Sequence, residues 1–237
     1  MEKIVVVSRT RMRNGVCCGA INISTGEFVR MHNANGGNLP SNAPYQIGEV
    51  YDASYCRAWN ARPKPHVEDK EIRSARKIGE MSTDELVDFI DRRVHVYSGS
   101  IDTIFEGSLD HSAYSPFVGP NNVPNESVCF WRTDAPIQKY VFMGKIKYRY
   151  KSNNISYVGF QDPIDVIPAG TLLRMSLANW WAKDQYTEKR CICNYPDGMV
   201  CDTKHLNCNH IFCDILIEYR ISKSLFLIKK DYFRGNC

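Results

Sequence analysis

The sequence predicts a mainly β protein with a minor α content, in which short strands close into small barrels. Runs of β-branched and aromatic residues, such as Ile4 to Val7 and Val16 to Asn22, are separated by Gly, Asn and Pro turn signals. Long segments with helical periodicity are rare, and strands do not alternate with helices along the chain. A parallel α/β fold is therefore not expected.

The first half is expected to form a five-stranded Greek-key barrel rather than a sandwich. Residues 16–22 and 27–32 flank a turn that contains Gly26, which predicts a hairpin. Residues 33–44 are rich in Asn, Gly and Pro, as is typical of a loop, and a further strand is expected at 45–55.

One helix is predicted between strands of the first half. Ser82 precedes Glu85 by three residues, which is the capping-box pattern of a helix N-terminus. Apolar residues from Leu86 to Ile90 follow at helical spacing, and the helix is expected to end near Arg93. Residues 99–109 have the character of a strand.

The second half is expected to begin after a loop at 116–124, which contains Gly119 and several asparagines. Residues 139–151 and 155–160 predict a hairpin, whereas 177–182 is expected to be helical. The predicted domains are a first small barrel with the inserted helix at 1–120, a second small barrel at 121–193 and a cysteine-rich extension at 194–237.

The composition is that of a globular protein. Of the 237 residues, 43% are hydrophobic and 24% charged, which excludes a disordered chain, and the net charge of +4 permits a polyanionic partner. No apolar run is long enough to span a membrane, and the run from Ile4 to Val7 is too short for the core of a signal peptide. We therefore expect a cytoplasmic location, no membrane partner and reduced cysteines.

Several sequence blocks resemble one family. IVVVSRTRM, VCCGAI, GEFVRM, PYQIGEVYD and PHVEDKEI in the first half, and NISYVGF, IPAGTLLRMSLANWW and Cys191 in the second, resemble the dual-OB domain family of prokaryotic proteins over roughly residues 1–193. The resemblance implies two tandem OB-like barrels that bind nucleic acid or a nucleotide. It also implies, by association only, a component of a bacterial defence system. It assigns no catalytic residue.

Two groups of basic residues are candidates for phosphate contacts. The first group consists of Lys145, Lys147, Arg149 and Lys151, and the second of Arg9, Arg11, Arg13 and Arg30. Members of the first group occupy every second position, so in a strand they share one face and form a basic ridge that matches a nucleic-acid backbone. The alternative for that group is a solvated basic face of an ordinary strand.

A short polar motif is the best candidate for catalysis. His66, Glu68 and Asp69 together offer ligands for Mg²⁺ or Mn²⁺, or an acid–base pair. A hydrolytic metal site needs further carboxylates, for which the sequence offers Asp52, Asp102 and Asp110. The alternative is a loop-to-strand junction in which these polar side chains bond to the backbone.

The C-terminal cysteines are candidate ligands of a structural zinc ion. The candidate ligands are Cys191, Cys193, Cys201, Cys208, His210 and Cys213. The usual C-x₂-C knuckle is missing from this segment, and without zinc the cysteines would be buried or free thiols.

Together these observations predict a nucleic-acid-binding protein with a preference for single-stranded DNA or RNA; they favour binding over catalysis and do not decide whether the protein is also an enzyme. Phosphate-binding and hydrolase signatures are absent from the sequence. One alternative is a metal-dependent nuclease that uses His66, Glu68 and Asp69. The other is a nucleotide-sensing or protein-interaction module with an apolar pocket lined by Trp180 or Trp181, although such tryptophans more often seal a core or an interface.

Overall fold

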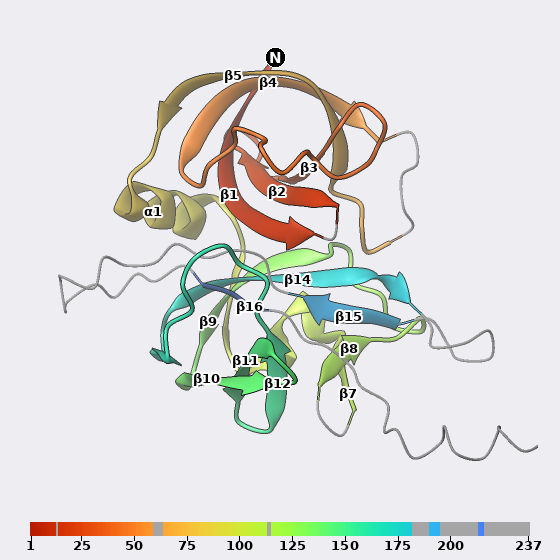
Figure 1. The fold of residues 1–237 in the computed structure, drawn as a ribbon, viewed down its shortest axis with the longest axis vertical. Coiled ribbons are helices and arrows are strands. Elements are labelled where there is room, and N and C mark those ends of the chain that lie inside the picture. The colour runs from red at the N-terminus through yellow and green to blue at the C-terminus, as the bar shows by residue number, and fades with distance from the viewer. Residues whose placement is uncertain (13, 59–63, 113–114, 182–189, 195–212, 216–237) are drawn as a thin grey trace, which may run out of the picture.

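Two β-rich halves are stacked along the long axis of the molecule (Figure 1). The computed structural model describes residues 1–12, 14–58, 64–112, 115–181, 190–194 and 213–215. In these residues the fold is mainly β, with α1 (Thr83–Arg93) as the α-helix, which confirms the predicted fold class. No helix among them is long and apolar enough to cross a membrane.

The first half is a closed five-stranded barrel, in the order β1-β2-β3-β5-β4. Its strands are β1 (Glu2–Met12), β2 (Gly15–Asn22), β3 (Phe28–His32), β4 (Glu49–Arg57) and β5 (Asp69–Glu80). All neighbours are antiparallel except β3 and β5, which pair in parallel and place Arg30 opposite Asp69. The barrel and its hairpin agree with the sequence prediction.

Strand β1 is buried on both faces, which explains its unbroken apolar run. Ile4 and Val6 belong to the barrel core, whereas Val5 and Val7 belong to a second core that includes α1 and part of the other half. Strands covered on both faces read as continuous apolar runs rather than as alternating ones.

Helix α1 has the predicted capping box and follows the last barrel strand. The Ser82 hydroxyl accepts from the Glu85 backbone N–H at 3.3 Å, and the Glu85 carboxylate accepts from the Ser82 N–H at 2.8 Å. Leu86 and Ile90 are fully buried against the barrel and against Phe130. The helix is therefore not inserted between barrel strands, because the five strands are complete at Glu80.

The second half consists of two sheets around one core. The larger sheet runs β6-β9-β14-β15-β8-β7, with β16 paired to β14, and the smaller runs β12-β11-β10-β13. The larger contains β6 (Val96–Gly99), β7 (Asp110–His111), β8 (Pro116–Val118), β9 (Val128–Thr133), β14 (Leu172–Trp181), β15 (Arg190–Asn194) and β16 (Cys213–Ile215). The smaller contains β10 (Ile137–Phe142), β11 (Lys145–Tyr150), β12 (Asn153–Ser156) and β13 (Val166–Ile167). Trp131, Tyr148 and Tyr150 fill the space between the sheets.

Three local predictions in this half were wrong. Residues 177–182 were expected to be helical, but β14 continues to Trp181 because it pairs with β9 and then β15, and its residues 172–177 are buried on both faces without alternation. The strand expected at 99–109 contains two 3₁₀ turns, η1 (Ile101–Thr103) and η2 (Phe105–Gly107). The third prediction was wrong only in part: β11 does pair with β12 as a hairpin, but 139–151 is not one strand, because it turns at Met143 and Gly144.

The pairing of β6 shows where the chain passes from one sheet system to the other. Strand β6 pairs with β9 in the second half, so the change falls between Glu80 and Val96. The sequence placed the boundary at 120, and the domain limits at 120 and 193 stay a prediction.

The two halves pack directly on each other. Val5, Val7 and Phe28 of the barrel share one apolar core with Phe130 and Leu172 of the second half. Beside this core the Arg174 guanidinium packs so closely on Gly19 that a Cβ there would lie 2.6 Å from Nη2. A side chain at position 19 would therefore require the Ser8 and Arg174 side chains to move.

Candidate nucleic-acid interface

A groove at the junction of the halves combines one residue from each predicted basic group. Arg11 at the end of β1 and Lys145 at the start of β11 both line it and are both exposed. The groove has a volume of about 480 Å³, and its remaining wall is formed by Gly144, Ile146 and residues 156–159 and 161–163. We call it the Arg11–Lys145 groove.

Backbone contacts fix the Arg11 side of this groove. The Arg11 N–H donates to the Val158 carbonyl at 3.1 Å, and Thr10 forms a β-bridge with Gly159. The Arg11 guanidinium lies 5.0 Å from the centre of the Phe160 ring, in a cation–π contact, and Nη2 donates to the Phe160 carbonyl at 3.4 Å. These contacts orient the guanidinium in advance, so less side-chain entropy is lost when it binds an anion.

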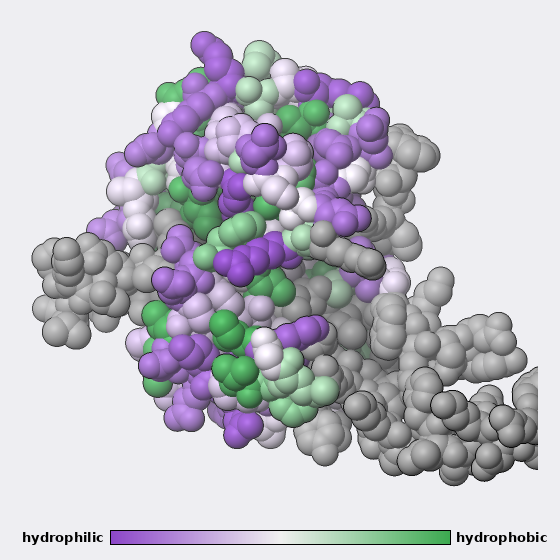
Figure 2. All heavy atoms as spheres, viewed as in Figure 1, coloured by the Kyte–Doolittle hydropathy of each residue, from purple (hydrophilic) through white to green (hydrophobic). Residues whose placement is uncertain are grey.

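Apolar side chains are exposed beside the groove. The hairpin that joins β10 to β11 turns next to Lys145, and Val141 and Met143 at its tip are 66% and 57% exposed. Figure 2 shows apolar residues gathered on the lower half of the molecule, where this hairpin lies. Asp162 also lines the groove and opposes anion binding there.

The remaining residues of the predicted basic ridge do not form an open track. Lys147 is only 5% exposed, and its ammonium donates to the Ser156 hydroxyl at 2.7 Å. Lys151 lies in the turn after β11 and forms an ion pair with Asp134 at 2.9 Å. Arg149 is exposed, with its guanidinium 4.8 Å from the Tyr140 ring centre.

The other arginines of the second basic group have different surroundings. Arg9 donates to the carbonyls of Ser41, Ala43 and Tyr45 at 2.8–3.0 Å, and thereby holds the loop before β4. Arg13 lies outside the residues that the structure describes.

Arg30 is joined to the three candidate catalytic residues in a buried network. Its guanidinium lies 2.7 Å from Glu68, 3.2 Å from Asp69 and 3.1 Å from His66 Nδ1. Ser127 of the second half donates to Glu68 and accepts from Arg30, so the network also ties the two halves together. The exposure of Arg30 is 8% and that of each partner is 3% or less, which removes Arg30 from the accessible basic surface.

This network does not resemble a hydrolytic metal site. The guanidinium occupies the space between the carboxylates, and no group of His, Cys, Asp or Glu among the described residues is arranged to hold a metal ion. The additional carboxylates are elsewhere: Asp52 pairs with Arg76, Asp102 with His111, and Asp110 lies on the edge strand β7.

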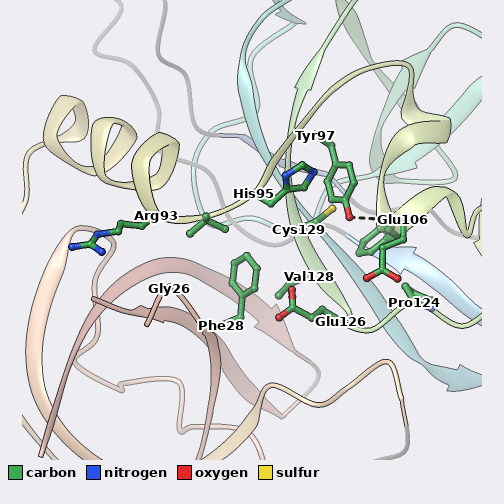
Figure 3. Close-up of a pocket in the computed structure, with 12 residues that line it drawn as sticks. Gly26, Phe28, Arg93, His95, Tyr97, Glu106, Pro124, Glu126, Val128 and Cys129 are labelled. Carbon is green, nitrogen blue, oxygen red and sulfur yellow. Dashed lines mark hydrogen bonds between the residues drawn. The ribbon is translucent and has the colours of Figure 1, made fainter. Parts of the chain in front are cut away.

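A second cavity between the halves was not anticipated from the sequence. It is lined by the barrel residues Gly26 and Phe28 and by side chains of the second half that include Tyr97, Glu106 and Glu126 (Figure 3). We call it the junction cavity. Glu126 follows an ordinary Pro-Asn loop pattern, so no signal in the sequence marks it as functional.

The zinc and tryptophan candidates are only partly described. Cys191 and Cys193 lie on β15 and Cys213 on β16, and Cys201, Cys208 and His210 fall outside the described residues. Trp180 packs on the core of the second half and donates to the Lys64 carbonyl at 2.7 Å, a contact between the halves. Structural zinc stays a prediction.

One family of known proteins matches the chain. The family model described as the dual OB-containing domain matches residues 2–191, which covers the barrel and most of the second half. No curated protein and no solved structure matches the chain.

Proposed function

The chain belongs to the dual OB-containing domain family, and we propose that it binds single-stranded DNA or RNA along the Arg11–Lys145 groove. Proteins with OB folds commonly combine a positively charged groove with aromatic side chains when they bind single strands. A cytoplasmic location and a role in bacterial defence are further proposals, which rest on the resemblance of the sequence to this family.

One observation carries the proposal. Arg11 and Lys145 are remote in the sequence, yet folding places both on one groove, with Arg11 stacked on Phe160. Arginine and lysine bind phosphate through charge-assisted hydrogen bonds, and arginine does so with two parallel bonds. The groove volume is in the range of small-ligand sites, so it accommodates a short stretch of one strand.

A salt titration tests this proposal. We expect fluorescence anisotropy with a short labelled single strand to show affinity that falls steeply with salt, because neutralised phosphates release counterions. In the Arg11→Ala/Lys145→Ala variant the slope of log K against log salt should decrease by about 1.4, at about 0.7 per lost phosphate contact.

Lys3→Ala is the matched control. Lys3 is an exposed cation on the same strand as Arg11, eight residues away and so roughly 26 Å distant. The control should bind like the unmodified protein. The proposal is contradicted if the control and the double variant lose equal affinity for the labelled single strand, or if heparin binds as tightly as nucleic acid. Either result would mean that binding is nonspecific attraction to positive charge.

A further inference from the structure

We propose that the junction cavity binds an amino-bearing nucleobase, with the Glu126 carboxylate as the hydrogen-bond acceptor. This inference deepens the proposed function. The base is supplied either by a free nucleoside or by the bound single strand, and only the second source rests on the proposed function.

The cavity has the size and the walls for a flat ring. Its volume is about 150 Å³, and an apolar cavity of about that volume takes up benzene. Phe28, Val128 and the buried Phe105 supply apolar walls, and Tyr97 and His95 lie in edge-to-face contact at 4.4 Å beside them. Figure 3 shows Phe28, Val128, His95 and Tyr97 around one open space, with contributions from both halves.

Glu126 has no partner in the cavity. No hydrogen bond or ion pair joins its carboxylate to any residue that the structure describes, and the charges that act on it are the carboxylates of Glu68, Glu106 and Glu27. Glu106 differs, because the Asn125 amide donates to both of its oxygens at 2.9–3.0 Å. Glu126 is therefore an acceptor that a ligand can satisfy.

The charges around Glu126 select the kind of ligand. The carboxylates of Glu106 and Glu27 repel phosphate, whereas the charge of Glu68 is compensated by its ion pair with Arg30. The Arg93 guanidinium at the edge of the cavity points away from it (Figure 3). A neutral base edge with N–H donors meets no such repulsion. Carboxylates accept from exocyclic amino groups of bases. Guanine offers two adjacent donors, whereas the single imide N–H of uracil lies between two carbonyls that a carboxylate repels.

The protonation of Glu126 gives the site a pH signature. Glu126 is exposed at the mouth of the cavity, and the loss of hydration on its cavity side, with the charges of Glu68, Glu106 and Glu27, raises its pKa to about 7. His95, Tyr97, Cys129 and Arg93 are the other titratable groups that line the cavity. Only the ionised carboxylate accepts two N–H bonds, so guanine binding should increase as the pH rises through 7.

Calorimetric titration with guanosine, cytidine, adenosine and uridine tests the assignment. We expect guanosine to bind most tightly above pH 7 and uridine most weakly. Glu126→Gln should weaken guanosine binding by at least about tenfold, because an amide has one acceptor oxygen and its NH₂ group faces the second donor of guanine, which is left unpaired. If nucleosides do not bind but the variant loses preference for a guanine-containing strand, the base comes from the strand.

Two controls separate this inference from the proposed function. Glu27→Gln removes a nearby charge without removing a cavity residue, and should leave guanosine binding unchanged at pH 9, where Glu126 is ionised in both proteins. Arg11→Ala/Lys145→Ala should weaken strand binding and leave nucleoside binding intact. The inference is overturned if guanosine and uridine bind equally, or if Glu126→Gln alters neither nucleoside nor strand binding.

Discussion

Arg11 and Arg30 lie on the two strands that flank β2 in the same barrel, yet their environments are opposite. Arg11 is exposed and stacks on a phenylalanine ring at the groove. Arg30 is buried, because the parallel pairing of β3 with β5 places it opposite Asp69 and beside Glu68. The comparison shows that two arginines of one barrel differ in accessibility because β5 brings two carboxylates to Arg30, whereas no ion pair covers Arg11 among the described residues.

The largest effect should follow from removing Arg30. We expect Arg30→Ala to lower the free energy of unfolding by about 3–5 kcal/mol, since Glu68 and Asp69 would remain buried without their partner. Urea denaturation measures this loss. Arg76→Ala, which breaks an exposed ion pair with Asp52, should cost less than about 1 kcal/mol. If the Arg30 variant is stably folded but binds single-stranded nucleic acid more weakly, Arg30 contacts nucleic acid as Arg11 is proposed to do, and the contrast between the two arginines is wrong.

A smaller effect should follow from changing the hairpin tip. The exposed side chains of Val141 and Met143 are next to the groove and can pack on unstacked bases. Val141→Ser/Met143→Ser should lower strand affinity on the order of fivefold, since partial burial of apolar side chains contributes about 1 kcal/mol. The salt slope should not change, because no ionic contact is lost. An altered slope would assign the tip to the charged interface.

A modest gain in stability is expected from Glu126→Gln. An unfolded glutamate has a pKa near 4.5, and in the folded protein the Glu126 pKa is raised to about 7. Between these values the folded state binds the extra proton, so stability falls as the pH rises. The variant should therefore melt at a higher temperature than the unmodified protein above pH 7, and at the same temperature below pH 4.5. A lower melting temperature above pH 7 would mean that Glu126 has a stabilising partner.

The smallest effect is expected at Lys151. Its ammonium is paired with Asp134 and lies in the turn beyond β11, outside the groove lining. Lys151→Ala should bind single-stranded nucleic acid as tightly as the unmodified protein, whereas Lys145→Ala should bind it more weakly. If the two variants lose equal affinity for nucleic acid, the whole basic ridge of β11 and its turn is the interface, and not the Arg11–Lys145 groove.

Features that depend on residues close together in the sequence could be predicted from it. The capping box of α1, the hairpin of β2 and β3 and the apolar run of β1 are set by local patterns. The strand at 177–181 was missed because β14 is covered on both faces over 172–177, so the alternation that identifies a strand is absent.

The candidate site depends on contacts between distant segments, and was therefore only partly predictable. Arg11 and Lys145 were identified as basic, but their shared groove requires the bridge between Thr10 and Gly159. The burial of Lys147 and the ion pairs of Arg30 come from strands that are paired by the tertiary fold. Glu126 carries no pattern of its own, because its character comes from three glutamates of other segments.

Mapping a photo-crosslinked single strand onto the protein tests the central claim most directly. If the groove binds the strand, crosslinked peptides will contain the end of β1, the β10–β11 turn and residues 156–163. Crosslinks confined to the opposite end of β1, or to β4 and β5 around Arg76, would contradict the account.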